Sequence, residues 1–237
     1  MHSNAAETPD YQSSGMDVSV PWWVVGVLVL GFIGLAVVTA GSNTLSIDLT
    51  VSDWVQSHDA QPAPFFGWIG DHLGGTKTGI GCLAAGFVVA IVLRSARIAW
   101  YLGIAAVLRL LATFLKEISD SPRPTVEQVE QLRNFESTGF PSGHATTATL
   151  VMGTLAYMVA SQTDRAAARV LLLLVWALGV GVTGFARIWH GAHWLTDTIG
   201  GTLVGLIIVL VAANLSAAIM EWRSSGLRTS PTRTPTP

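Results

Sequence analysis

The segment 186–197 contains three side chains whose types and spacing suit phosphoryl chemistry. Arg187 supplies a guanidinium, His193 an imidazole, and Asp197 a carboxylate four positions after the histidine. Residues four apart share a face of a helix, so a helix that begins near Trp194 would let Asp197 hold the imidazole in one tautomer and stabilise its charged form. An oriented imidazole beside a fixed guanidinium suits nucleophilic attack on an anion such as a phosphate. Aromatic and basic residues are also common in membrane-edge turns, so other parts of the chain must decide.

Two further groups of residues offer cations and a helix start that binds anions. Lys116 and Arg123 flank a proline-stiffened loop; a guanidinium matches phosphate oxygens, and an ammonium adds a point charge. Ser142 is a good N-cap, Gly143 lets a ligand approach the backbone, and His144 falls on the first turn of the next helix. Free N–H groups at a helix start form an anion site. Alone, such cations usually anchor a span and such a cap needs no ligand.

The composition is that of a membrane protein. Of the 237 residues, 50% are hydrophobic and only 12% are charged, and the mean hydropathy is +0.50. A soluble domain carries about twice that fraction of charge. The net charge of −2 gives no indication of nucleic-acid binding. Cys82 is the single cysteine, which excludes a disulfide within the chain and a cysteine-based metal site, and we expect it to serve packing.

Six apolar segments are long enough to cross a membrane as helices, which need about 20 residues each. We expect spans at 21–40, 76–93, 96–115, 142–161, 167–185 and 194–220. Residues 41–75 mix apolar and acidic side chains, which is typical of an amphipathic segment lying in the interface. Residues 1–20 and 223–237 are predicted to be disordered tails. The prediction is an all-α fold, an integral membrane six-helix bundle with one domain at 21–222 and an interfacial segment after the first span.

A cleaved signal peptide is the alternative for residues 21–40. Signal peptides have a basic segment before a shorter apolar core, whereas residues 1–20 contain neither lysine nor arginine. The apolar run is also of full membrane length. We therefore interpret it as the first span.

Basic residues favour one orientation of the bundle. Those that lie beside the spans or in the C-terminal tail and fall on one side are Arg94, Arg97, Arg165, Arg169, Arg223, Arg228 and Arg233. The positive-inside rule puts that side in the cytoplasm. We expect a multi-pass protein of a plasma membrane with both termini inside, and the composition suits a bacterium. In this orientation the outer loops contain Lys116, Arg123 and Arg187, against the positive-inside rule. Cations that depart from the rule usually have a functional role.

Together, the three groups resemble the type-2 phosphatidic acid phosphatase family, the lipid phosphatase branch of the superfamily that includes vanadium haloperoxidases. The family pattern is Lys-x6-Arg-Pro, then Pro-Ser-Gly-His, then Ser-Arg-x5-His-x3-Asp. In this chain it is met by Lys116, Arg123, Pro124, the run 141–144, Arg187, His193 and Asp197. The resemblance covers roughly residues 45–215. One position departs: Ala186 replaces the usual small polar residue, which could loosen a hydrogen bond around Arg187 and cause a modest loss of activity at most.

The resemblance implies a role for each matched residue. His193 attacks phosphorus to form a phosphohistidine, and Asp197 orients it. The phosphate is held by Lys116, Arg123, Arg187, the Ser142 hydroxyl and the Gly143 backbone N–H. His144 protonates the leaving group and then activates water. Three fixed cations can take the place of a metal, and the acidic residues of the loop (Glu117, Asp120, Glu127 and Glu130) are too dispersed to hold Mg²⁺. We therefore expect no metal and no cofactor.

Arg109 lies inside the third predicted span, two turns below Lys116 and on the same face. An arginine within a span costs about 2.5–3.5 kcal/mol on insertion scales, so it should face the bundle interior or a wet cavity. It either contacts a diphosphate or lipid headgroup, or bonds to helix carbonyls or snorkels.

Other polar or small residues are expected to have structural roles. His58 and His72 lack ligand partners at a metal spacing and should be surface histidines. His190 should be an exposed loop residue, with a position at the pocket mouth as the alternative. Gly201 and Gly205 form a small-x3-small face that usually indicates close helix packing.

The sequence therefore predicts a membrane phosphatase that cleaves a lipid phosphate monoester or diphosphate at the outer face. Candidate substrates are a polyprenyl diphosphate, such as undecaprenyl diphosphate recycled for the cell wall, phosphatidylglycerophosphate and phosphatidate. A phosphotransferase that passes the phosphoryl group to an acceptor other than water is the alternative. A transporter would want polar residues through the spans, where only Arg109 qualifies clearly. A haloperoxidase fits least, because relatives with that activity are soluble.

Overall fold

The computed structural model describes residues 19–41, 44–58, 62–119, 121–132 and 138–228, and every regular element within them is helical. The elements are α1 (Trp22–Thr39), α2 (Ser46–Gln56), α3 (Ala63–Leu73), α4 (Thr76–Val92), α5 (Ala96–Leu111), a 3-10 turn η1 (Ala112–Phe114), α6 (Leu115–Ile118), α7 (Gly143–Ala160), α8 (Ala166–Trp189) and α9 (Leu195–Arg228).

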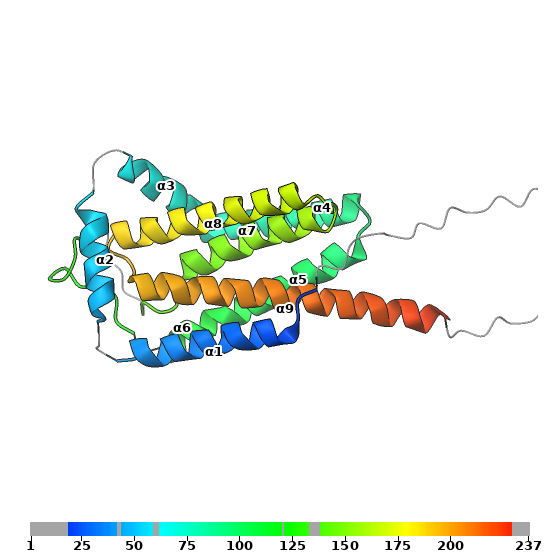
Figure 1. Cartoon of the computed structure of the whole chain (residues 1–237), viewed down its shortest axis with the longest axis horizontal. Coiled ribbons are helices and arrows are strands. Elements are labelled where there is room, and N and C mark those ends of the chain that lie inside the picture. The colour runs from blue at the N-terminus through cyan, green and yellow to red at the C-terminus, as the bar shows by residue number, and fades with distance from the viewer. Residues whose placement is uncertain (1–18, 42–43, 59–61, 120, 133–137, 229–237) are drawn as a thin grey trace, which may run out of the picture.

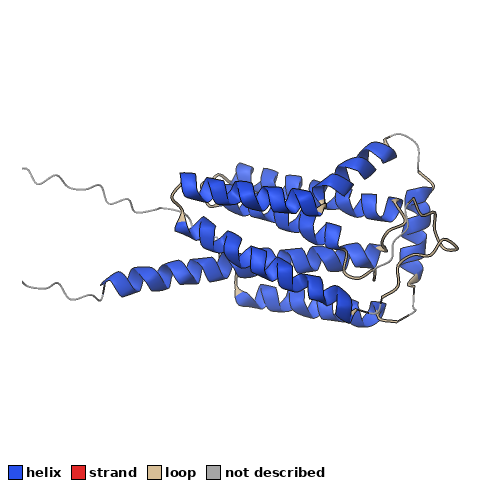
Figure 2. Ribbon diagram, turned by 180° about the vertical axis from the view of Figure 1, so that it is seen from behind, coloured by secondary structure: helices blue, strands red, loops and turns tan. Residues whose placement is uncertain are grey.

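The long helices run side by side, and α2 lies across one end of them (Figure 1). The central helix α9 packs against α1, α5 and α7, and α8 packs against α3 and α7. Figure 2 shows the same bundle from behind, with α9 extending beyond its neighbours at the end opposite α2. The α4–α5 and α7–α8 connections, which carry Arg94 and Arg165, also lie at that opposite end (Figure 1).

Several of these helices are suited to a bilayer. Four of them are long and apolar enough to span it: α1, α5 with η1, α8 and α9. The pair α3 and α4, bent by 52°, would make a fifth if it forms one broken span. Large apolar side chains point outward from α8, among them Leu171, Leu174 and Leu178, as expected for surfaces in contact with acyl chains. The chain is a multi-pass membrane protein.

The predicted helix positions agree with the structure more closely than the predicted loops do. Helix α7 coincides with the fourth expected span, but its polar first half keeps it out of the helices that pass as spans, so the count of six stays a prediction. The segment 41–75 contains two helices, α2 and α3, and its location in the interface stays a prediction. Helix α8 continues through Trp189, four residues beyond the expected end at residue 185, and α9 continues to Arg228, into the segment expected to be a tail.

The start of α7 is pressed against the start of α9. A Cβ on Gly201 would lie 2.3 Å from the carbonyl oxygen of Ser142, and a Cβ on Gly205 would lie 2.5 Å from Thr149 Cβ. Only glycine allows backbones to approach this closely. The expected packing role of Gly201 and Gly205 is thus confirmed, and it brings the two helix starts that carry His144 and Asp197 together.

Candidate active site

The residues matched to the phosphatase pattern come from six places in the chain and meet at the α2 end of the bundle; one of them, His193, is in the connection between α8 and α9. Lys116 is in α6, and Arg123 is in the loop that follows it. Gly143 and His144 begin α7, Arg187 is in the last turn of α8, and Asp197 is in the first turn of α9. Two expectations are corrected here, because Lys116 and Arg187 are helical and do not lie in loops.

His193 is held through both ring nitrogens. Its Nδ1 lies 3.2 Å from Asp197 Oδ2, and its Nε2 lies 3.2 Å from Arg123 Nη1. A guanidinium can only donate hydrogen bonds, so Nε2 must be the acceptor and the proton must sit on Nδ1, where it is donated to the carboxylate. This tautomer leaves the Nε2 lone pair directed toward the cations. It is the form that a nucleophilic imidazole requires.

The Asp197 carboxylate is fully buried and fixed by the backbone. Its Oδ2 accepts a hydrogen bond of 3.0 Å from the Trp194 amide, so Asp197 also caps the start of its own helix. The backbone carbonyl of Asp197 accepts a hydrogen bond of 2.9 Å from the Ser142 amide. Asp197 therefore links the α9 start, the His193 ring and the α7 start.

A second buried carboxylate anchors α9 from the side of α2. Asp48 Oδ1 accepts a hydrogen bond of 2.9 Å from the Thr196 amide, and Asp48 Oδ2 accepts one of 2.9 Å from the Thr196 hydroxyl. Asp48 is only 2% exposed. No role for Asp48 could be predicted from the sequence, because its partner lies 148 positions away.

Three cations converge on His193. Burial lowers the pKa of its imidazole well below the usual value, and the charges of Arg123, Lys116 and Arg187 lower it further. The ring is therefore neutral at neutral pH, with its lone pair available. Burial also lowers the pKa of the Lys116 ammonium to about 8, and the charge of Arg123 adds to this effect. Burial likewise lowers the pKa of Arg123. Clustered, partly desolvated cations of this kind favour an anionic ligand.

The start of α7 has the cap expected of it. Ser142 Oγ accepts a hydrogen bond of 3.4 Å from the Ala145 amide, and Ser142 is fully buried. Gly143 faces two cations: a Cβ there would lie 3.8 Å from Lys116 Cε and 3.9 Å from Arg109 Nη2. The N-terminus of α7 thus opens toward positive charge supplied by α5 and α6, which is the arrangement expected of an anion site.

Asp71 is a charged residue of the site that the sequence analysis did not identify. It lies in α3, and its Oδ1 pairs with Arg187 Nη1 and lies 3.5 Å from His144 Nε2. No spacing in the sequence points to it, because Asp71 and Arg187 are 116 positions apart. The signal that could have found it is an acidic residue within an apolar, glycine-containing segment that precedes a span.

The structure also shows the burial and contacts of the other histidines and of Ala186. His190 is buried, and its Nδ1 donates to the Ala186 carbonyl at 2.6 Å, so the expectation of an exposed loop residue is wrong. The reason is that α8 continues to Trp189. His58 and His72 are exposed, as expected. Ala186 is fully buried where α8 crosses Gly70, so a small side chain fits there.

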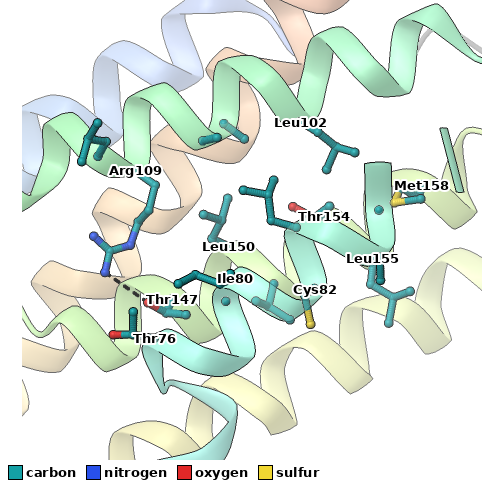
Figure 3. A pocket seen from close by; sticks show the side chains of 18 of the residues that line it. Thr76, Ile80, Cys82, Leu102, Arg109, Thr147, Leu150, Thr154, Leu155 and Met158 are labelled. Carbon is teal, nitrogen blue, oxygen red and sulfur yellow. Dashed lines mark hydrogen bonds between the residues drawn. The ribbon is translucent and has the colours of Figure 1, made fainter. Parts of the chain in front are cut away.

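A cavity of about 570 Å³ begins beside the cations of the active site and is bounded by α4, α5 and α7. Arg109 stands at one end, where its Nη2 donates to Thr147 Oγ1 at 3.2 Å (Figure 3). The remaining lining is almost entirely apolar and includes Ile80, Leu102 and Met158. Cys82 also lines the cavity and is exposed, which corrects the expectation that it serves packing.

Metal-binding chemistry has no obvious location in the described part of the chain. Among those residues, no group of three or more His, Cys, Asp or Glu side chains is arranged to hold an ion. Asp120 falls outside the described residues.

Comparison with solved structures shows that the fold occurs in known membrane proteins. A crystal structure described as the first transmembrane PAP2 type phosphatidylglycerolphosphate phosphatase, from Bacillus subtilis, aligns with a TM-score of 0.71 and 23% identity, over 82% of this chain and 96% of that one. Aquifex aeolicus LpxE aligns with a TM-score of 0.54 and 20% identity, over 73% of this chain and 96% of that one.

Sequence comparison gives a curated relative and a family. Phosphatidylglycerophosphatase B of Bacillus subtilis (strain 168) is 28% identical over 116 residues, which are 48% of this chain. The match spans only 56% of that relative's length. The sequence profile of the PAP2 superfamily matches residues 97–221, more than half of the 237 residues, and these include Lys116, His144 and Asp197. The chain therefore belongs to the PAP2 superfamily.

Proposed function

We propose that this protein is a membrane phosphatase that removes a phosphoryl group from a lipid through a phosphohistidine intermediate. The observation that carries the proposal is the arrangement of His193, with Nδ1 on Asp197 and Nε2 directed at Arg123. An imidazole in that tautomer, neutral and surrounded by cations, is prepared to attack phosphorus.

The reaction proceeds in two displacements. In the first, the His193 Nε2 lone pair forms a bond to phosphorus while the bond from phosphorus to the leaving oxygen breaks, and His144 gives that oxygen a proton. In the second, a water oxygen attacks phosphorus, His144 takes the water proton, and the P–N bond breaks to return His193. Lys116, Arg123 and Arg187 stabilise the charge of the equatorial oxygens in both steps.

The apolar cavity supports a lipid as the substrate. Ligand pockets have volumes of about 300–1,000 Å³, and the 570 Å³ cavity is lined by apolar side chains below the cations. A phosphate held at the start of α7 would leave its hydrocarbon chain between α4, α5 and α7. Phosphatidylglycerophosphate is the first substrate to test, because a relative that is 28% identical bears the name phosphatidylglycerophosphatase B. Phosphatidate and a polyprenyl diphosphate follow.

Arg109 is proposed to contact the headgroup. Its guanidinium lies between the cations of the site and the apolar cavity, and it donates a hydrogen bond to the neutral hydroxyl of Thr147. An arginine between charged and apolar surroundings suits contact with a second phosphate or with another polar group of the lipid headgroup. If Arg109→Leu leaves both activity and headgroup preference unchanged, with Arg109→Lys as the charge-retaining control, the residue is structural.

The site is proposed to face the outer side of a plasma membrane with both termini in the cytoplasm. The connections that carry Arg94 and Arg165 lie at the end of the bundle opposite the site, and the positive-inside rule assigns such connections to the cytoplasm. Labelling of single cysteines in whole cells at Glu127 and Asp164, in a Cys82→Ser background, would read the orientation directly.

The decisive experiment is phosphate release from the three lipids in detergent, with and without chelator, in parallel with His193→Ala. We expect release from at least one lipid, no effect of the chelator, and a loss of about 10³-fold or more in the variant. Release that survives in His193→Ala would contradict the mechanism. If the phosphoryl group is transferred to an added alcohol acceptor and not to water, the protein is the phosphotransferase considered as the alternative.

A further inference from the structure

Helix α3 reaches the site because its glycines let it approach two other helices. A Cβ on Gly67 would lie 2.7 Å from the Trp189 ring, and a Cβ on Gly70 would lie 2.5 Å from the Val182 carbonyl oxygen of α8. A Cβ on Gly74 would lie 2.7 Å from both the Cβ and the carbonyl oxygen of His144. Each glycine is thus in close contact with α8 or with the first turn of α7. Asp71 lies on this helix between Gly70 and Gly74.

The Asp71 carboxylate connects two residues of the proposed mechanism. Its Oδ1 pairs with Arg187 Nη1 from α8 and lies 3.5 Å from His144 Nε2 on α7. The Asp71 side chain is 19% exposed and that of His144 is 35% exposed, so both border the open part of the site. At 3.5 Å the contact is electrostatic and not a short hydrogen bond. A proton on Nε2 would therefore not be held in a short hydrogen bond to Asp71.

Burial and the surrounding cations oppose the protonated form of His144 that its acid function needs, and Asp71 counteracts them. The cations Arg187, Lys116 and Arg123 act on this imidazole from α8, α6 and the loop after α6. Like charges disfavour the protonated ring that a general acid needs, whereas a carboxylate in contact favours it. Asp71 is the carboxylate in contact with the ring, and it comes from an element outside the family pattern.

We propose that Asp71 is a positioning residue that favours the protonated form of His144 and holds its ring beside the leaving group, which equips the site for alkyl phosphate monoesters. This inference rests on the proposed function. An alkoxide leaves only with a proton, whereas a nitrophenolate or a phosphate group leaves without one. The need for a charged acid, and hence for Asp71, is specific to substrates in which phosphate is esterified to an alkyl alcohol.

The test compares two leaving groups on the same lipid chain. The substrates are a long-chain alkyl phosphate and a nitrophenyl phosphate that carries a chain of the same length. Asp71→Asn keeps the shape of the side chain and removes its charge. We expect kcat/KM for the alkyl phosphate to fall about tenfold or more, and for the nitrophenyl phosphate by less than about threefold, as for the loss of a general acid. Asp53→Asn, an exposed carboxylate on α2, is the matched control and should leave both rates unchanged.

The ratio of the two rates is measured on one preparation, so partial misfolding does not change it. An equal loss on both substrates, or no loss on either, would overturn the role of Asp71, since damage to Arg187 or to the fold affects both leaving groups. Asp71→Glu, which restores a carboxylate, should restore the wild-type ratio; a ratio like that of Asp71→Asn would also overturn the proposal. If the unaltered protein releases phosphate from neither substrate, or His193→Ala retains activity, the proposed function itself fails, and this inference fails with it.

Discussion

In the proposed mechanism, two contacts prepare His193 as the nucleophile. One carboxylate fixes the proton on Nδ1, and one guanidinium fixes the direction of the lone pair on Nε2. Burial and the neighbouring cations lower the pKa of the imidazole, so the ring stays neutral without any further base. In the proposed mechanism the same cations stabilise the transferred phosphoryl group, and the bound anion offsets the electrostatic cost of clustering them.

Asp197→Asn should separate orientation from charge. The amide keeps the size of the side chain, but its NH₂ group can donate to Nδ1 and favour the wrong tautomer, in which Nε2 carries the proton. By analogy with the aspartate of the serine protease triad, we expect a loss of about 10³–10⁴-fold in kcat. The unfolding midpoint should fall as well, because the NH₂ group replaces the oxygen that accepts from the Trp194 amide. Phosphate release and thermal unfolding in detergent measure the two quantities. A loss below tenfold would mean that Asp197 does not set the tautomer.

Lys116 should give the enzyme an alkaline limit. With a pKa of about 8, the ammonium is charged below that pH and neutral above it. Phosphate binding should therefore weaken as pH rises through about 8, and kcat/KM, which reports the free enzyme, should decline there. Lys116→Arg keeps a cation over this range and should move the decline to higher pH. A pH profile of kcat/KM that is the same for both proteins would show that another group titrates.

At the scale of elements, the site depends on helices that are fastened at their ends. The start of α9 is tied to α2 through Asp48 and Thr196, and to α7 through the Ser142 amide. Unpaired N–H groups at a buried helix start are costly, so Asp48 satisfies a donor that would otherwise be orphaned. This contact fixes the turn that carries Asp197 one residue further on.

Asp48→Ala should destabilise the fold from a position that does not touch substrate. It removes two hydrogen bonds and leaves the buried Thr196 amide without this acceptor, at a cost of about 1–3 kcal/mol. Asp53→Ala, on the exposed face of the same helix, should change the free energy of unfolding by no more than about 0.5 kcal/mol. The unfolding midpoint of each variant in detergent tests this. Equal midpoints would show that α9 does not need the cap.

The sequence predicted the elements that carry a period or a motif, and it missed the ones that act through packing. Apolar length located α1, α4, α5, α7 and α8 to within a few residues, and it located the start of α9 but not its end at Arg228. The spacing of Arg187, His193 and Asp197 located the imidazole and its carboxylate. Helix α3 was missed because its 11 residues are too short for a span and its glycines weaken a helix signal. Asp71 was missed with it, because its contacts exist only after α3 packs on α8.

At the scale of the whole molecule, the bundle places a polar site at one end and an apolar cavity beneath it. The cavity between α4, α5 and α7 begins at Arg109 and continues along apolar side chains (Figure 3). Its position explains why a phosphatase would be built on helices of membrane length, since the hydrocarbon part of a lipid can stay among apolar side chains while its phosphate reaches the cations. The same bundle would then hold both the phosphate and the hydrocarbon chain of the lipid.

Filling the cavity should therefore change the preference for chain length. Ala106 lines the cavity from α5, whereas the adjacent Val107 is 58% exposed and does not line it. Ala106→Phe should raise KM for a long-chain phosphate at least about tenfold, because apolar contact area worth more than about 1.4 kcal/mol is lost. A short-chain phosphate should be hydrolysed as before, since the cations remain in place. Val107→Phe adds the same ring outside the cavity and should leave both substrates unaffected; if it had the same effect as Ala106→Phe, the tail would lie elsewhere.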